Sequence, residues 1–260
     1  MLKGGILPGA PYWSTQRNGE SSMKTLAKLV AFATVFSAPI TIMAHPALAG
    51  YSCKGHTATI VGTQGNDTIT GRESEGADVI VTLGGDDRIY AGGGDDIVCS
   101  QAGDDMVNGM RGKDLIDAGY GNDVVGGGYD SDVLYLGSGS DVYDGDASGS
   151  VNHLDTIYGQ DGRDKIDTNL DSPMTVYGGK GSDWIRAYSI FSDHIYGGVG
   201  VDAINVRDFW YQDGEYLESD RPDTVNAGPE PENTKDSCVV NSNDTVSNCE
   251  SVETHTDPPF

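Results

Sequence analysis

The chain has 260 residues, of which 40 are acidic, 16 are basic, 37 are glycine and only 37% are hydrophobic, so its formal net charge at pH 7 is −24. A chain with so many charges of the same sign and so few apolar residues tends toward disorder unless something offsets the repulsion. The charge argues against nucleic acid as a partner and favours cations or basic surfaces.

The N-terminal segment has the pattern of a secretion signal. From Met23, two lysines precede a largely apolar run and a small-x-small cleavage site at residues 47–49. A membrane-spanning helix is the alternative, but the apolar run is short and interrupted by proline. We expect residues 1–49 to be an extension and signal peptide, the signal proper being 23–49, and Met23 is a second candidate start. The mature chain is then expected to be secreted, with no membrane span.

A nine-residue repeat dominates the middle of the chain. Each repeat has an aspartate, an apolar or aromatic residue two positions later, and in most cases a glycine two positions earlier; Asp130 replaces that glycine in one repeat. Such a period indicates that each repeat is one supersecondary unit. The aspartates in strict nine-residue register are Asp78, Asp87, Asp96, Asp105, Asp114, Asp123, Asp132 and Asp141.

Each unit divides into a glycine-rich turn and a short strand. In "AGGGDDIVC", residues 91–99, we expect a turn from Ala91 to Asp96 and a strand from Ile97 to Cys99, with Val98 pointing inward. A helix is excluded, because the apolar period is nine rather than 3.6 and glycine disfavours helix.

Stacking is required, because one unit cannot bury its single apolar side chain. Two units complete one circuit of a flattened coil, and strands of successive circuits pair in parallel, roughly 4.8 Å apart. The fold class is therefore all-β, a parallel β-roll (β-solenoid) of stacked nine-residue turn-strand units. Successive circuits place Asp78, Asp96, Asp114 and Asp132 in one column and Asp87, Asp105, Asp123 and Asp141 in another at the opposite edge.

Columns of carboxylates at this spacing repel one another unless a cation lies between them. Carboxylates together with the carbonyls of glycine-rich turns suit Ca²⁺, which takes six to eight oxygen ligands, better than Mg²⁺, which demands a stricter octahedron. The pattern therefore predicts several calcium ions.

The repeats resemble a known family. "GGKGSDWIR" (178–186) fits the GGxGxDxUx nonapeptide of the RTX, or hemolysin-type, calcium-binding repeat at every position, where U is a large apolar residue; "GMRGKDLID" (109–117) and "GTQGNDTIT" (62–70) lack only the second glycine. The resemblance covers roughly residues 57–205. It implies a parallel β-roll with calcium between successive turns. The two ends of the repeat region are similar to the termini of small secreted actinobacterial proteins of this class, and we expect them to act as caps.

The resemblance assigns the metal role residue by residue. Positions matching the metal aspartate of the motif are Asp67, Asp78, Asp87, Asp96, Asp105, Asp114, Asp123, Asp132, Asp141, Asp155, Asp164, Asp183, Asp193, Asp202 and Asp223.

Several repeats depart from the motif, and sites at those turns are in doubt. Met174 replaces an aspartate, Phe191 replaces the glycine before Asp193, and insertions at 145–154 and 206–220 break the phase. In three other repeats the residue just before the metal aspartate is also acidic, and there we expect solvated surface charge: Asp86, Asp95 and Asp104.

Four cysteines in a secreted chain predict two disulfides, with three possible connectivities. Sequence proximity favours Cys238–Cys249, which leaves Cys53–Cys99. A four-cysteine zinc site is the alternative, but the paired short spacings that it needs are absent. We expect a roll with an N-terminal cap over 50–205 and, over 206–260, an aromatic loop, degenerate repeats and a disulfide-pinned cap.

No catalytic motif accompanies the repeats. The chain has neither HExxH nor G-x-S-x-G, its histidines are isolated, and carboxylate pairs that recur in every repeat indicate structure rather than a glycosidase site. Residues 206–220, with Phe209, Trp210, Tyr211 and Tyr216, form either a loop covering the coil, which we favour, or a platform for sugar rings.

The predicted function is a secreted, non-enzymatic calcium-binding protein with a structural or adhesive extracellular role, and an extracellular glycan or cell-surface component as a candidate partner. The alternative is a secreted carbohydrate-active or other hydrolytic enzyme that uses the roll as scaffold.

Overall fold

The computed structural model describes residues 50–73, 76–145, 154–168, 172–187, 191–206, 209–212, 215–218, 222–229 and 235–255. The chain divides into two units, residues 1–38 and 39–260, and every described residue belongs to the second unit. The extension and signal expected at 1–49 therefore lie outside the described residues. Within the described part, no helix is long and apolar enough to cross a membrane.

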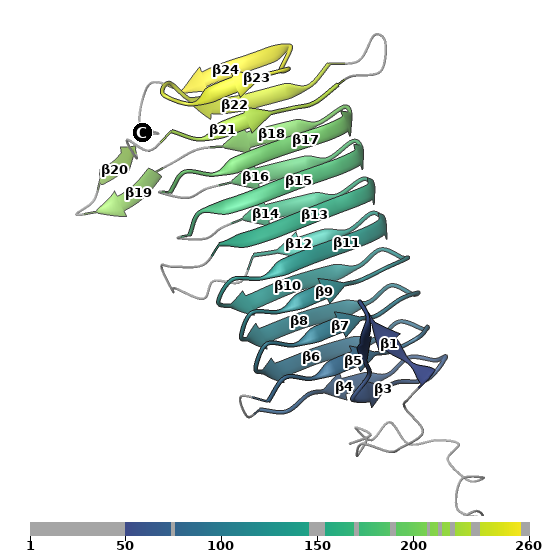
Figure 1. Ribbon diagram of the computed structural model, residues 1–260. Helices are drawn as coiled ribbons and strands as arrows, with labels where there is room; N and C mark the ends of the chain where they lie inside the picture. The colour runs from purple at the N-terminus through teal and green to yellow at the C-terminus, as the bar shows by residue number, and fades with distance from the viewer. Residues whose placement is uncertain are drawn as a thin grey trace, which may run out of the picture. The chain divides into compact units, whose positions relative to one another are not determined.

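Two ten-stranded sheets form the roll (Figure 1). Sheet 1 contains β4 (Thr68–Thr70), β6 (Arg88–Gly93), β8 (Met106–Arg111), β10 (Val124–Tyr129), β12 (Val142–Asp144), β14 (Lys165–Thr168), β16 (Trp184–Ala187), β18 (Ala203–Val206), β22 (Ser237–Asn241) and β24 (Ser251–His255). Sheet 2 contains β3 (Ile60–Val61), β5 (Val79–Val81), β7 (Ile97–Cys99), β9 (Leu115–Asp117), β11 (Val133–Gly139), β13 (Asp155–Gly162), β15 (Met174–Gly181), β17 (His194–Gly200), β21 (Thr224–Asn226) and β23 (Thr245–Ser247).

The chain alternates between the two sheets, and each strand pairs in parallel with the strand one circuit later. Val124 is opposite Val142 in sheet 1, and Ile97 is opposite Leu115 in sheet 2, so both registers advance by two repeats per circuit. The predicted all-β, parallel β-roll is confirmed.

The core lies between the sheets and consists of the apolar residue that follows each motif aspartate. These side chains form one buried cluster along the roll. Full burial of each stabilises the fold by roughly 1.5–3 kcal/mol. In the eight regular repeats they are Ile80, Ile89, Val98, Val107, Ile116, Val125, Leu134 and Tyr143, and none is more than 2% exposed.

Some strands are longer than the repeat pattern predicts. Strand β7 has the expected bounds, but β6 extends through Gly93, into the segment expected to be a turn. Its residues Gly92 and Gly93 pair with Met110 and Arg111 of the next circuit. Identical turns stacked in parallel can supply each other's backbone hydrogen bonds, so the ladder continues into the turn.

The fourth position of each repeat requires glycine for a physical reason. Gly103 has φ of +134°, and a Cβ there would lie 2.1 Å from the carbonyl oxygen of Gly85 in the preceding circuit. Both the left-handed backbone and the close stacking therefore disfavour a side chain. Asp130, which replaces this glycine in its repeat, still adopts a φ of +80°.

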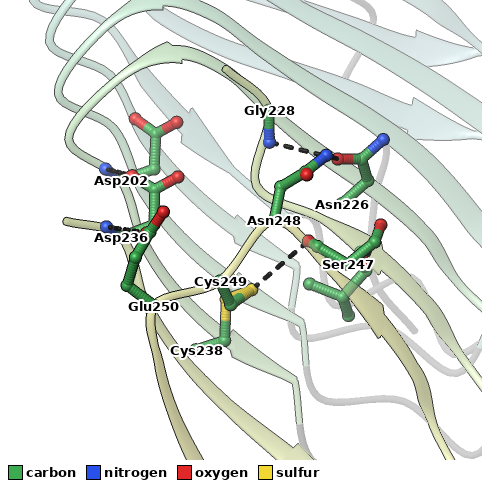
Figure 2. The surroundings of a disulfide bond; sticks show 10 residues. Asp202, Asn226, Gly228, Asp236, Cys238, Ser247, Asn248, Cys249 and Glu250 are labelled. Atoms are coloured by element: carbon green, nitrogen blue, oxygen red, sulfur yellow. Dashed lines mark hydrogen bonds between the residues drawn. A yellow bond between two sulfur atoms is a disulfide. The ribbon is translucent and has the colours of Figure 1, made fainter. Parts of the chain in front are cut away.

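Both predicted disulfides are present, Cys53–Cys99 and Cys238–Cys249, and the alternative zinc site is excluded. The first joins the hairpin of β1 (Ser52–Cys53) and β2 (His56–Thr57) to β7, where Cys53 packs with buried Val61 and Val81. The second joins β22 to the segment between β23 and β24 (Figure 2).

The aromatic segment expected to be a loop at 206–220 contains an antiparallel hairpin instead. Strands β19 (Phe209–Gln212) and β20 (Glu215–Glu218) pair with each other and with neither ten-stranded sheet. The register places Trp210 opposite Leu217, and aromatic and branched residues favour strands. Whether its side chains cover the coil or form a sugar platform lies outside the described residues.

Candidate metal site: two columns of buried carboxylates

The motif aspartates lie in two columns, one at each edge of the roll. Edge 1 is the column that precedes the strands of sheet 1, and edge 2 is the column that precedes the strands of sheet 2. The predicted division of the eight regular aspartates between two columns is confirmed. Edge 1 contains Asp67, Asp87, Asp105, Asp123, Asp141, Asp164, Asp183 and Asp202; edge 2 contains Asp78, Asp96, Asp114, Asp132, Asp155, Asp193 and Asp223.

A repeated hydrogen bond builds each column. The backbone N–H of one aspartate donates to Oδ1 of the aspartate one circuit later, for example from Asp78 to Asp96 at 2.7 Å and from Asp87 to Asp105 at 2.7 Å. The columns cross the first insertion intact, because Asp132 donates to Asp155 at 2.9 Å and Asp141 to Asp164 at 3.0 Å. Each carboxylate thus serves the backbone through one oxygen.

Three further acidic residues extend the columns, and the nine-residue pattern does not identify them. At edge 1, Asp202 donates to Asp236 and Asp236 donates to Glu250 (Figure 2); at edge 2, Asp223 donates to Asp244. Insertions had destroyed the nine-residue phase by this point. One local signal survives: each acidic residue is still followed, two positions later, by an apolar residue that lies in a strand. These residues are Cys238, Val252 and Val246.

The irregular repeats keep their place in edge 2 even where the carboxylate is lost. Met174 lies opposite Asp155, is 2% exposed, and donates its backbone N–H to Asp193 at 2.9 Å. Asp193 itself is fully buried although Phe191 replaces its glycine. The backbone ladder therefore tolerates methionine, while the turn at Met174 lacks one carboxylate.

The acidic residues just before the column are exposed, as predicted, but they also take part in hydrogen bonds. Asp86 accepts the backbone N–H of Asp104 at 3.2 Å, Asp95 accepts that of Lys113 at 2.9 Å, and Asp104 accepts that of Asn122 at 2.8 Å. A second, solvent-facing ladder thus accompanies the buried one.

The second oxygen of the column aspartates is the chemically unusual feature. In the part of the chain that the structure describes, nine of these aspartates have an Oδ2 atom that is buried without a hydrogen-bond partner. A buried carboxylate oxygen without a partner is costly, so a ligand is expected there. The nine are Asp87, Asp96, Asp105, Asp114, Asp123, Asp132, Asp141, Asp164 and Asp183.

Burial raises the pKa of all nine carboxyl groups, and neighbouring carboxylates raise most of them further. The pKa rises to about 7 for Asp114 and to about 9 for Asp132, where the carboxylates of Asp155 and Asp114 add to the effect of burial. Without a cation, part of this column takes up protons at neutral pH.

At one set of turns the buried oxygens face an open corner. An open corner is a repeat whose first position is glycine. A Cβ built on Gly109 would lie 2.3 Å from Oδ2 of Asp114 and 2.4 Å from the carbonyl oxygen of Gly127 in the next circuit. The carboxylate and the carbonyl therefore border the same space. Gly62 also leads such a corner, but there Oδ2 of Asp67 accepts the backbone N–H of Thr63 at 2.6 Å. The other open corners are led by Gly109, Gly127, Gly159, Gly178 and Gly197, and at Gly127 the atoms nearest to a Cβ all belong to Asp132.

At other turns a side chain fills the same corner. Thr82, Ser100, Ala118 and Leu136 occupy the first repeat position at edge 1 and are fully buried. The Thr82 hydroxyl donates to the carbonyl of Ser100 at 2.9 Å, and the Ser100 hydroxyl donates to that of Ala118 at 2.8 Å. These carbonyls, unlike that of Gly127, already have a side-chain partner.

The donor set fits calcium. Within the described ranges, no group of three or more histidine, cysteine or acidic side chains is arranged to hold a metal. At the corner of Gly109 the oxygens that face the same space are one carboxylate oxygen and one backbone carbonyl. An all-oxygen set drawn largely from the backbone suits a hard cation that takes six to eight ligands.

Two comparisons with known proteins bear on this site. The family model of the RTX calcium-binding nonapeptide repeat (4 copies) matches in overlapping segments over residues 57–148, 155–172 and 175–189. These segments include both edges of the regular roll. No match was found among curated proteins.

Proposed function

Because the chain carries RTX calcium-binding nonapeptide repeats, we propose that it binds several calcium ions between successive circuits of its roll. The observation that carries this proposal is the row of buried Oδ2 atoms without partners. Each has a raised pKa, and a cation would satisfy the oxygen while keeping the carboxylate ionised.

The open corners are the proposed principal sites. There the aspartate oxygen and a carbonyl of the next circuit border the same space, as at Gly109, where these are Asp114 and Gly127. The corners of Thr82 and Ser100 hold a hydroxyl that already satisfies the carbonyl, so we assign them weaker sites or none. The aspartates proposed as principal ligands are Asp114, Asp132, Asp164, Asp183 and Asp202.

Calcium would supply the positive charge that this acidic roll lacks. The chain's own residues supply the rest: the Oδ1 atoms hold adjacent circuits in register through backbone N–H groups, and the Oδ2 atoms aim at the corner. Since a site forms only when two circuits stack, the free energy of binding is also free energy of folding.

The proposed setting is extracellular, and the proposed role is structural or adhesive rather than enzymatic. Supporting the extracellular setting are the signal-like sequence before residue 50 and two disulfides, which are characteristic of oxidising compartments.

Calorimetric titration of calcium into EDTA-stripped, dialysed protein tests the proposal. We expect several ions per chain, and fewer in Asp114→Ala than in Asp95→Ala, which removes an exposed acid from the same edge. Absence of binding heat, or equal stoichiometry in both variants, would refute it.

A further inference from the structure

A groove of about 560 Å³ crosses several successive circuits on the sheet 2 side of the roll. It is bounded at one end by Leu83 and the disulfide-bonded Cys99, and at the other by Gln160. Its volume is within the range of sites that hold small molecules. It contains none of the column aspartates, so it is separate from the proposed calcium sites.

The groove arises from the residues at the second repeat position. Gly119 and Gly137 leave its middle without side chains, while Gln101 and Gln160 stand on either side of them in the same column. With about 4.8 Å per circuit, the two glutamines are about 14 Å apart along the roll.

Both glutamines adopt a backbone that disfavours their side chains. Gln101 and Gln160 each have φ of +76°, and the same column contains glycine at Gly179 and Gly198, with φ of +112° and +110°. A non-glycine residue in this region is strained, and such strain often occurs at ligand sites. Leu83, in the same column at the end of the groove, has a similar φ of +81°, so the column carries side chains at the two ends of the groove and glycine in its middle.

The lining offers hydrogen bonds that the protein does not use. The side chains of Gln101, Ser138 and Gln160 have no hydrogen-bond partner in the described part of the chain. Tyr120 stands beside them and is 71% exposed. The lining thus combines two amides, a hydroxyl and an uncovered aromatic ring.

The charge of the groove is balanced. Asp117, its one carboxylate, pairs with Lys54 at 2.6 Å, and the same ammonium lies 4.6 Å from the ring centroid of Tyr135. A neutral ligand therefore fits the groove better than an anion, which the chain's net charge of −24 would also repel.

We infer that this groove binds a short neutral stretch of a polysaccharide chain. Side-chain amides present a donor and an acceptor together, which matches neighbouring sugar hydroxyls, and an exposed tyrosine ring provides a surface for the apolar face of a sugar. An extended peptide fits less well, because it needs free backbone groups. Those of the groove are paired, as Tyr120 donates to Gln101 at 2.6 Å and Ser138 to Gly119 at 2.7 Å.

The test uses calcium-saturated protein and three neutral tetrasaccharides: cellotetraose, maltotetraose and chitotetraose. We expect at least one to bind in calorimetry, and Tyr120→Ala to weaken its binding about tenfold, or about 1.4 kcal/mol. Gln160→Ala should also weaken the binding of that sugar. The matched control is Tyr129→Ala, which removes an exposed tyrosine from the same repeat position at the other edge.

Circular dichroism of each variant confirms that the roll is folded before binding is measured. The inference is overturned if none of the three sugars binds at concentrations up to about 10 mM, which would reveal even a millimolar Kd. It is also overturned if Tyr129→Ala weakens binding as much as Tyr120→Ala, or if Trp210→Ala abolishes binding while Tyr120→Ala does not. A failure of calcium binding would appear separately, in the calcium titration.

Discussion

Over residues 82–141 the two edges of the roll carry the same ladder of buried aspartates beside different first-position residues. Edge 1 has Thr82, Ser100, Ala118 and Leu136, all buried, whereas edge 2 has Ala91, Gly109 and Gly127. The backbone hydrogen bonds of the ladder are alike, at 2.7–2.9 Å on both edges.

The difference shows that the ladder and the metal site are separable properties of the repeat. The aspartate at its fixed position holds two circuits in register on either edge. The first position decides what completes the corner: a hydroxyl, a methyl group or a leucine side chain on edge 1, and on edge 2 the open space beside Gly109 and Gly127. The carboxyl group of Asp132, whose pKa is raised to about 9, lies beside an open corner.

The largest expected effect is a pH dependence of the calcium-free protein. The pKa of Asp96 is raised to about 6, that of Asp114 to about 7 and that of Asp132 to about 9. At pH values between the unfolded and folded pKa of these groups, the folded state binds more protons than the unfolded state. Their contribution to the free energy of unfolding is therefore fully present below about pH 4 and is lost as pH rises. In EDTA we expect a higher melting temperature at about pH 5 than at about pH 8.

A matched pair sharpens this test, because the pKa of Asp141 on edge 1 is raised only to about 6. Asp132→Asn should remove the alkaline end of the pH dependence, and Asp141→Asn should not. A melting temperature in EDTA that is flat or rises toward alkaline pH would contradict the prediction.

Next in size is the loss of an ion. At calcium concentrations about 100 times Kd, each bound ion stabilises the fold by about 2.7 kcal/mol. Asp132→Ala should remove about that much calcium-dependent stability, measured as the difference between denaturant unfolding with low and with saturating calcium. Asp123→Ala, from the filled corner of Ala118, is the control and should lose clearly less. If the two variants lose the same amount, open and filled corners do not differ in calcium binding.

A smaller change acts on the corner while leaving every carboxylate in place. In Gly127→Ala the new methyl group would lie 2.3 Å from Oδ2 of Asp132, so we expect a lower calcium stoichiometry in calorimetry. The converse change, Ala118→Gly, would open the corner beside Asp123, so we expect a higher calcium stoichiometry, together with a loss of about 0.5–1 kcal/mol of calcium-free stability through backbone entropy. Unchanged stoichiometry in Gly127→Ala would show that the corner does not hold the ion.

The smallest expected effect concerns the one turn in which glycine is replaced. Asp130 has φ of +80°, so Asp130→Gly should stabilise the calcium-loaded protein by about 1 kcal/mol in denaturant unfolding. The reverse change on edge 1, Gly121→Asp, should destabilise it by more, because a Cβ there would overlap sterically with the carbonyl oxygen of Gly103, only 1.9 Å away. A destabilised Asp130→Gly variant would indicate that the aspartate side chain has a role of its own.

Much of the fold was predictable because the repeat is strict where the roll is regular. The constant spacing from Asp78 to Asp132 places these residues in one column, and the nearness of Cys238 to Cys249 favours the disulfide that the structure contains. The pattern could not show that Ser100 closes its corner, since that depends on where a hydroxyl points after stacking.

The C-terminal third was harder to predict because insertions shift the phase. Asp236 follows Asp202 by 34 residues, so the period fails although the hydrogen bond between them is kept. The hairpin of β19 and β20 had a local signal that the aromatic cluster concealed, since Asp213-Gly214 separates its strands and is a common hairpin turn sequence.

The most direct test of the central claim is a pair of far-ultraviolet circular dichroism melts at neutral pH, one in EDTA and one in about 10 mM calcium, above the affinity range of extracellular modules. If calcium completes the aspartate columns, the β-sheet signal and the melting temperature should both rise strongly with calcium and much less with the same concentration of magnesium. Identical spectra and melting temperatures in EDTA and calcium would contradict the account.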